Sequence, residues 1–368
     1  MAYKLNRRRF KKIVNRLRKL PGGINFFRYS FNKLRGFFLT ASRSTKVPYP
    51  SSIMFEVTNH CNLGCITCPR EYAFGHAMAK GSIDLDKMKK VIDEVAPYID
   101  SIGLTGLGET LLYKKLEETL AYIKSKNKGI QTFVSTNAHI PGAENYIEKL
   151  APYLDTVQIS IDGTEKIYEA VRLKSNYNFF IDMVQKIVKL CKEHHVAVMF
   201  NFVAVKENYH QMKDIVKLAS ELGVDDVNIT PVNIASITTL DLSYYDIFYG
   251  DDFKNELKAA YQLSHDVKNV NLTVWDIKSK NQFQKCHLVW NHFYVSWDGY
   301  MTPCCAKPFP KELNFGNVFE TSMMESLNSK EYRQFRELWY RNEPPEFCKN
   351  CHLIDLKPID VNFEPKLN

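Results

Sequence analysis

The chain has 368 residues, of which 45% are hydrophobic and 13% aromatic, and it carries a formal net charge of +8. It is long enough to bury a large core and too long for one small domain, so we expect two structural units. No apolar run of about 18 residues is present, and the N-terminus lacks the apolar core of a secretory signal, so neither a membrane-spanning helix nor export is expected. Nine cysteines without an export signal favour a cytoplasmic location, where thiols bind metals more often than they form disulfides.

The positive charge is concentrated at the start of the chain. Residues 1–46 contain 14 Lys and Arg, whereas the first acidic residue is Glu56, so the remainder is mildly acidic. Apolar residues recur there at three- and four-residue steps, which predicts an amphipathic helix that ends at Pro21: Phe10, Ile13, Val14, Leu17 and Leu20.

Residues 24–43 add five phenylalanines and a tyrosine among further basic residues. We therefore interpret residues 1–50 as a basic amphipathic helical extension. It can contact an anionic membrane surface through residues 1–46, dock on the body of the protein, or remain a solvated charged face. Nucleic acid is disfavoured as a partner because no recognition motif accompanies the charge.

From residue 51 onward, short apolar runs rich in β-forming residues alternate with amphipathic segments of helical period, such as 84–99 and 208–223. This alternation predicts βαβ units, a parallel sheet and an α/β fold over residues 51–240. Periodicity alone does not distinguish an open sheet from a partial barrel. The six apolar runs are 53–57, 101–107, 130–136, 156–162, 196–203 and 226–232.

The pattern breaks after about Leu240, where aromatic residues and cysteines become dense. Residues 286–352 hold five of the nine cysteines. We expect residues 241–368 to form a second, smaller domain that depends on a metal.

The stretch EVTNHCNLGCITCPR follows the first predicted strand and places Cys61, Cys65 and Cys68 at the spacing C-x3-C-x2-C. Three thiolates are one short of the four that close a structural zinc site or a protein-ligated four-iron cluster. A cluster with one free iron can accept a chelating ligand, such as the amine and carboxylate of an amino acid. The alternative is a zinc site completed by a residue such as His60.

Polar residues and glycines follow the next three predicted strands. Because the carboxyl ends of parallel strands share one edge, we expect these residues to meet the cysteine loop. Glycine backbone permits close approach of a ligand, a carboxylate suits an ammonium group, and short polar side chains suit ribose hydroxyls. Together they describe a site for S-adenosylmethionine: Gly106, Gly108 and Glu109, then Ser135 and Asn137, then Ser160 and Asp162.

With this motif order, the chain resembles the radical S-adenosylmethionine (radical SAM) superfamily over residues 51–235. The resemblance implies a partial (β/α)6 TIM-like barrel and a [4Fe–4S] cluster on the three cysteines. It also implies reductive cleavage of S-adenosylmethionine to a 5′-deoxyadenosyl radical, which abstracts a substrate hydrogen. By the same resemblance Glu109 and its glycines contact the methionine amine, Ser135 and Asn137 hold the ribose, and Arg172 binds a carboxylate.

A second set of cysteines has the spacing C-x17-C-x43-C-x2-C: Cys286, Cys304, Cys348 and Cys351. It resembles the auxiliary-cluster domains called SPASM and twitch, which implies a second [4Fe–4S] cluster with four cysteine ligands. Zinc is the alternative. Spacing from Gly299 favours Cys304 over Cys305 as the ligand. A spare Cys305 is either a hydrogen-atom donor to a substrate radical or, as we favour, a small buried hydrophobic residue.

We therefore expect a radical SAM oxidoreductase, a dehydrogenase or epimerase, that acts on a sugar, cyclitol or related polar small molecule, including a lipid-linked one. The electron donor would be a flavodoxin or ferredoxin. One alternative is a peptide-modifying maturase, which we rank lower because residues 1–50 lack the strand pattern of a peptide-recognition domain. The other is a zinc-containing module that binds membranes or polyanions.

Overall fold

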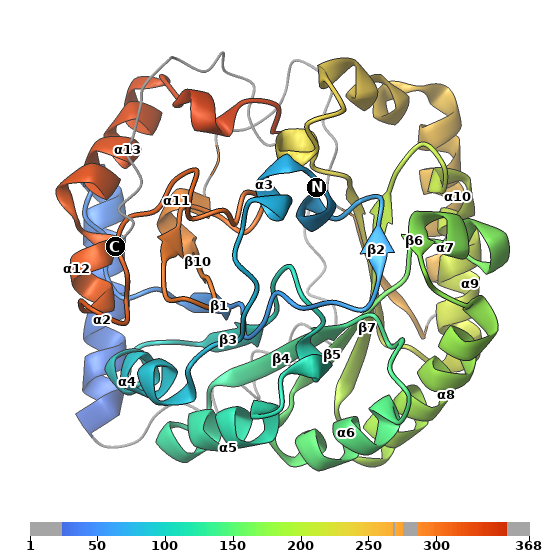
Figure 1. Ribbon diagram of the computed structural model, residues 1–368, viewed down its shortest axis with the longest axis horizontal. Coiled ribbons are helices and arrows are strands. Elements are labelled where there is room, and N and C mark those ends of the chain that lie inside the picture. Colours follow the sequence, from blue (N-terminus) through green and yellow to red (C-terminus); the bar gives the residue numbers. More distant parts are fainter. Residues whose placement is uncertain (1–23, 268, 275–285, 287, 352–368) are drawn as a thin grey trace.

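The computed structural model describes residues 24–267, 269–274, 286 and 288–351. Over these residues one sheet with the order β11-β10-β1-β3-β4-β5-β7-β8-β9 forms the centre of the protein. Figure 1 shows it curving into an open barrel with helices around its outside. The strands of this sheet are β1 (Ser52–Phe55), β3 (Ser101–Leu104), β4 (Gln131–Thr136), β5 (Thr156–Ser160), β7 (Ala197–Ala204), β8 (Asp226–Pro231), β9 (Asn271–Val274), β10 (His292–Val295) and β11 (Met301–Thr302).

Each of the six predicted apolar runs overlaps one strand, and these six strands are neighbours in chain order, paired in parallel throughout. The predicted α/β partial barrel is therefore confirmed. In register, Val134 of β4 lies opposite Leu104 of β3 and Val157 of β5, and all three are fully buried. A layer of β-branched and leucine side chains thus sets the pairing of these strands.

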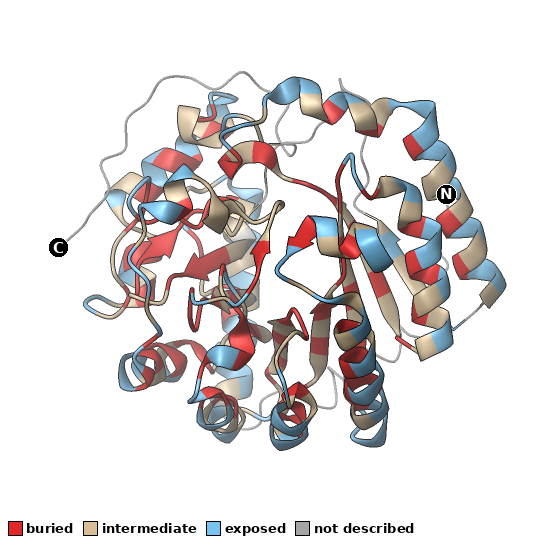
Figure 2. Cartoon of the chain, turned by 45° about the vertical axis from the view of Figure 1, so that its right-hand side comes forward, coloured by how far each residue is buried: buried red, intermediate tan, exposed pale blue. Residues whose placement is uncertain are grey.

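Among the helices, those that connect successive strands between β1 and β9 cover the outer face of the sheet and turn their apolar sides inward, as the buried residues in Figure 2 show. In α8, for example, Phe180, Val184, Ile187 and Cys191 are fully buried at helical spacing. The helices are α2 (Ile24–Ala41), α3 (Ala73–His76), α4 (Leu85–Val95), α5 (Leu116–Lys126), α6 (Ala143–Leu150), α7 (Glu165–Val171), α8 (Tyr177–Glu193), α9 (Met212–Leu222), α10 (Asp251–Val267), α11 (Leu288–Asn291), α12 (Met323–Leu327) and α13 (Lys330–Arg341).

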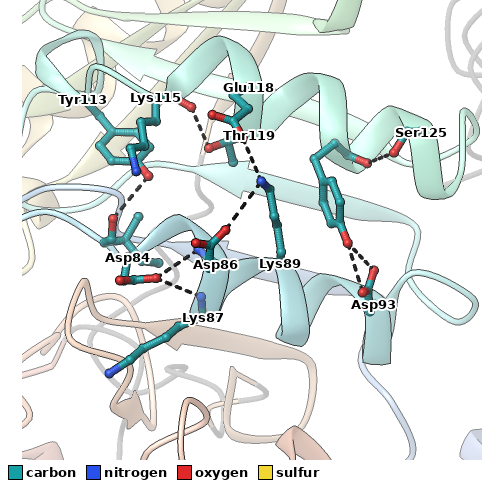
Figure 3. Close-up of polar contacts among 12 residues, drawn as sticks. Asp84, Asp86, Lys87, Lys89, Asp93, Tyr113, Lys115, Glu118, Thr119 and Ser125 are labelled. Carbon is teal, nitrogen blue, oxygen red and sulfur yellow. Dashed lines mark hydrogen bonds and ion pairs between the residues drawn. The ribbon is translucent and has the colours of Figure 1, made fainter.

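Polar contacts on the surface fix the first two covering helices. The Asp84 carboxylate accepts hydrogen bonds from the backbone N–H groups of Asp86 and Lys87, so it caps the N-terminus of α4. Lys89 of α4 donates to Glu118 of α5 at 2.7 Å (Figure 3). These exposed contacts orient α4 and α5 and add little to stability.

Residues after 240 extend the same sheet at both ends. Strand β9 pairs in parallel with β8, and β10 pairs in parallel with β1, with Phe293 opposite Ile53. The C-terminal part of the chain therefore shares a backbone ladder with the barrel. The division into residues 1–50, 51–240 and 241–368 stays a prediction, since no boundary is visible in the ladder itself.

The N-terminal extension is described from Ile24, so the helix predicted from Phe10 to Leu20 lies outside the described residues. Helix α2 runs along the flank of the barrel beside α12 and α13 (Figure 1). Within the described part of the chain, no helix is both long and apolar enough to cross a bilayer.

Helix α13 is attached to the rest of the protein by a buried arginine. The Arg336 guanidinium donates to the backbone carbonyls of Val289 (2.9 Å), Thr45 (3.1 Å) and Leu327 (2.7 Å). The central carbon of the guanidinium, Cζ, lies 3.8 Å from the centre of the Tyr332 ring, and Arg336 is fully buried. One side chain thus joins α13 to three other segments.

Replacing Arg336 with alanine should lower the free energy of unfolding by roughly 3 kcal/mol, because three carbonyls, two of them in buried contacts, lose a charged donor. Arg333→Ala, an exposed change on the same helix, should cost less than about 0.5 kcal/mol. Urea unfolding followed by circular dichroism measures both. Equal midpoints for the two variants would contradict this role of Arg336.

Candidate functional site

The cysteine loop is held in place by a short pairing with a distant segment. Strand β2 (Gly64–Cys65) pairs antiparallel with β6 (Arg172–Leu173), so that Cys65 lies opposite Arg172. The backbone N–H of Ile66 also donates to the Val171 carbonyl at 3.0 Å. The loop is therefore clamped to the end of α7, and its thiols are half-buried at the carboxyl edge of the sheet.

Two of the three thiols receive side-chain hydrogen bonds. Asn137 Nδ2 lies 3.8 Å from Cys61 Sγ, and Arg172 Nη1 lies 3.8 Å from Cys65 Sγ. Asn137 also donates to Asn62 Oδ1 at 2.9 Å, within the cysteine loop. N–H groups directed at sulfur stabilise thiolate ligands. Asn137 and Arg172 can therefore stabilise the thiolates of Cys61 and Cys65, in addition to the roles expected from the sequence.

Glu109 is buried at the end of the loop that follows β3. Its carboxylate accepts from the backbone N–H groups of Leu111 (3.0 Å) and Asn137 (2.6 Å) and from Thr136 Oγ1 (2.8 Å). Burial raises the pKa of Glu109, and these donors oppose the rise. The carboxylate thereby links the end of β4 to the Gly106–Glu109 loop and lies close to Asn137.

Asp162 and Arg172 form a buried ion pair. Arg172 Nη2 lies 2.7 Å from Asp162 Oδ2, and Asp162 Oδ1 accepts from the backbone N–H of Val203 at 2.8 Å. Asp162 is fully buried and therefore has no surface left for the ribose contact expected of it. Arg172 Nε is buried without a hydrogen-bond partner in the described protein, so one donor of this guanidinium remains for another group.

The two glycines of the Gly106–Glu109 loop are required by the protein itself. A Cβ at Gly108 would lie 2.2 Å from the Thr58 carbonyl oxygen, and one at Gly106 would lie 2.6 Å from the Glu56 side chain. Both contacts are shorter than any side chain can tolerate. Close packing against the β1 loop therefore accounts for both glycines, alongside the ligand contact expected from the sequence.

Glu56 is a residue of this edge that the sequence analysis did not single out. Its fully buried carboxylate accepts from the Leu107 N–H at 3.0 Å and from the Tyr294 hydroxyl at 2.8 Å. Burial raises its pKa. An acid inside the apolar run IMFEV was the available signal, because a charged residue in a buried strand needs specific partners. Glu56 joins β1, the Gly106–Glu109 loop and β10.

The remaining expected residues are at the same edge with fewer contacts. Ser135 in β4 and Ser160 at the end of β5 are half-buried. The structure thus brings the cysteine loop, Glu109, Asn137 and the Asp162–Arg172 pair together.

These residues fit the iron–sulfur cluster that the resemblance implies. Burial raises the pKa of the Cys65 thiol to about 12 and that of Cys68 to about 11, so thiolates at this place need positive charge beside them. Iron supplies that charge, and the unpartnered Arg172 Nε suits the carboxylate of a chelating amino acid. Among the described residues, no three His, Cys, Asp or Glu side chains are grouped as a site for a single metal ion.

The four cysteines of the second set, Cys286, Cys304, Cys348 and Cys351, line one small apolar cavity. Lys307 and Trp339 line the same cavity. Asn233 Nδ2 lies 3.5 Å from Cys351 Sγ. Lys307 is buried and donates to the Phe347 carbonyl at 2.9 Å, and burial lowers its pKa. Four converging thiols and a cation fit a four-iron cluster, whose thiolate ligands bring excess negative charge.

Cys305 is not among the described residues that line this cavity, whereas its neighbour Cys304 is. The geometry therefore favours Cys304 as the fourth ligand, in agreement with its spacing from Gly299 in the sequence. Burial raises the pKa of the Cys305 thiol to about 12. Its role as a hydrogen-atom donor stays a prediction.

Comparison with protein families gives two matches. The model of the radical SAM superfamily matches residues 55–219, and the model of the iron–sulfur cluster-binding domain SPASM matches residues 286–352. The first match contains the cysteine loop, Glu109 and the Asp162–Arg172 pair. The second contains the four cysteines of the small cavity.

Three curated proteins are similar over most of the chain. The tungsten-containing aldehyde ferredoxin oxidoreductase cofactor-modifying protein of Pyrococcus furiosus is 25% identical over 84% of this chain and 90% of its own length. The antilisterial bacteriocin subtilosin biosynthesis protein AlbA of Bacillus subtilis is 24% identical over 85% of this chain and 66% of its own length. PqqA peptide cyclase of Bradyrhizobium diazoefficiens is 23% identical over 86% of this chain and 83% of its own length.

A solved structure with the same fold is SuiB of Streptococcus suis bound to S-adenosylmethionine. It superposes with a TM-score of 0.67 at 15% identity, covering 96% of this chain and 82% of that one. At this identity the similarity concerns the fold.

Replacing any one of Cys61, Cys65 or Cys68 with alanine should lower the iron content after anaerobic reconstitution from about eight to about four atoms per chain. About four iron atoms are lost because the two remaining thiolates cannot hold the first cluster. Cys191→Ala, which changes a fully buried thiol in α8, should retain about eight. Iron and sulfide assays measure the content. A triad variant that keeps all its iron would contradict the assignment.

Proposed function

We propose that this chain, which belongs to the radical SAM superfamily and carries a C-terminal SPASM domain, is a radical enzyme that modifies a peptide. The observation that carries the chemistry is the convergence of three thiols, a buried carboxylate and a buried arginine at one sheet edge. When bound, the [4Fe–4S] cluster supplies one electron to S-adenosylmethionine, which yields the radical that removes a hydrogen atom from the substrate.

The proposed roles of the site residues follow from their contacts. Cys61, Cys65 and Cys68 would hold the cluster as its three protein ligands. Glu109 and the backbone of the Gly106–Glu109 loop bind the methionine ammonium group, and the free Nε of Arg172 points to a carboxylate contact.

Around these groups, Asn137 directs its amide at Cys61, and Ser135 and Ser160 remain for hydroxyl groups of the ribose. Asp162 acts through Arg172, since it holds the guanidinium in place and has no exposed atoms of its own. It is therefore a positioning residue in this proposal.

The four cysteines of the SPASM domain hold the second cluster, with Cys304 as the fourth ligand. Lys307 and the Asn233 amide, which reach this cavity from two different segments, offset the charge of its thiolates. A flavodoxin or ferredoxin in a cytoplasmic compartment would supply the electron.

The substrate proposal rests on the curated relatives. Two of the three similar proteins described above act, by their names, on a peptide or in the synthesis of a bacteriocin. From the sequence alone, we expected a sugar or cyclitol substrate and ranked a peptide second. The relatives support the second, and they do not support specificity as a dehydrogenase or epimerase of a small molecule.

Glu109→Gln should weaken binding of S-adenosylmethionine by about tenfold to a hundredfold, because a charge-assisted hydrogen bond to the ammonium is lost. Thr136→Val provides the matched control, since it removes one protein donor to Glu109 and keeps the charge. It should change affinity by less than about threefold. Calorimetry on the anaerobic holoenzyme measures both.

If Glu109→Gln binds S-adenosylmethionine like the wild type, the contact with the ammonium is wrong. If Thr136→Val is weakened as much as Glu109→Gln, then Glu109 serves the protein structure alone.

A second prediction tests the substrate class. The reduced holoenzyme is incubated with unlabelled S-adenosylmethionine and fractions of host cells grown in deuterium oxide. The peptide fraction should transfer deuterium to 5′-deoxyadenosine, as read by mass spectrometry, and the saccharide fraction should not. The Cys61→Ala variant is the control and should give no transfer from either.

Deuterium that comes from the saccharide fraction alone would contradict the peptide proposal and restore the sugar substrate. The superfamily assignment would stand in that case.

A further inference from the structure

Helix α2 is attached to the protein by its polar side. Tyr29 donates to Asp100 at 2.5 Å, and Lys33 contacts the same carboxylate at 2.7 Å. Asn32, 4% exposed, exchanges two hydrogen bonds with the backbone of Tyr49. These bonds fix which side of α2 faces the barrel.

The apolar side of α2 therefore faces solvent. Five large apolar side chains follow one another at three- or four-residue steps and form one stripe along the helix, which we call the phenylalanine stripe. Phe26 (42% exposed) and Phe37 (66%) lie beside it. The stripe consists of Ile24 (66% exposed), Phe27 (68%), Phe31 (68%), Leu34 (53%) and Phe38 (61%).

This arrangement is the reverse of an ordinary surface helix, which buries its apolar side. A contiguous apolar patch of this kind marks an interaction surface. The charge around it is of one sign. Arg28 and Arg35 are exposed next to the stripe, α2 contains no acidic residue, and residues 1–46 carry 14 basic residues and no acid.

We propose that α2 is a membrane-docking surface that lies flat on a bilayer containing anionic lipid, with the phenylalanine stripe inserted among the acyl chains. Apolar aromatic residues flanked by Arg and Lys are the composition that binds such an interface. The adjacent basic residues attract the lipid phosphates. A second copy of this chain is disfavoured as the occupant because it would bring the same positive charge to the contact.

Among the described residues no helix can span the membrane, so this contact is peripheral. It places the flank formed by α2, α12 and α13 against the lipid (Figure 1). The inference is independent of the substrate and of the radical chemistry, since it uses no residue of either cluster site.

The test is sedimentation of the full-length holoenzyme with vesicles of equal parts phosphatidylcholine and phosphatidylglycerol, and with vesicles of phosphatidylcholine alone. The wild type should bind the anionic vesicles, and added salt should weaken the binding. Phe27→Ser with Phe31→Ser should lower the partition coefficient at least about tenfold, since two apolar side chains no longer insert. Arg28→Gln with Arg35→Gln should lower it on anionic vesicles specifically.

Tyr146→Ser with Leu242→Ser is the matched control, because these side chains are 50% and 55% exposed on other elements. This pair should leave binding unchanged. Iron content and thermal midpoint are measured for every variant to show that each is folded holoenzyme.

Two results would overturn the proposal. In the first, the wild type fails to sediment with anionic vesicles; a lower thermal midpoint or a changed oligomeric state of the Phe27/Phe31 variant would then mean that protein covers the stripe. In the second, the Phe27/Phe31 variant sediments as the wild type does, which would assign binding to the basic charge alone.

Discussion

Parallel strand pairing is the constraint on which the site depends. Because β1, β3, β4, β5 and β7 run in the same direction as neighbours, their carboxyl ends meet at one edge. The cysteine loop, Glu109, Asn137 and Asp162 follow these strands and converge there from segments that are far apart in the sequence. Glu109, Asn137 and Asp162 lie within a few residues of the ends of β3, β4 and β5, whereas the cysteine loop lies farther from β1 and is held by the pairing of β2 with β6.

Buried carboxylates then join the loops at that edge. Glu109 connects its own loop with the end of β4, Asp162 holds Arg172 beside Cys65, and Glu56 connects β1 with β10. Each of them receives several donors, because an isolated carboxylate without partners would be too costly to bury. The network thus joins the surroundings of the cysteine loop to β10, which lies within the residues that match the SPASM domain.

The sequence predicted the larger features because they depend on local patterns. Six apolar runs became six parallel strands, and the spacing of Cys61, Cys65 and Cys68 indicated the chemistry. Long-range contacts were not predictable in this way. The pairing of β10 with β1, the use of Asp162 for Arg172 and the position of Glu56 depend on which segments meet in the fold, and spacing carries no such information. Likewise, the abundance of phenylalanine in residues 24–43 was visible in the sequence, whereas the outward orientation of these side chains follows from the contacts of Tyr29, Asn32 and Lys33.

Cys61, Cys65 and Cys68 would hold a cluster that leaves one iron for S-adenosylmethionine. The most direct measurement is electron paramagnetic resonance of the reduced protein with Cys348→Ser and Cys351→Ser, which leaves the signal of the first cluster alone. Adding S-adenosylmethionine should change this signal. An identical signal with and without S-adenosylmethionine would contradict it.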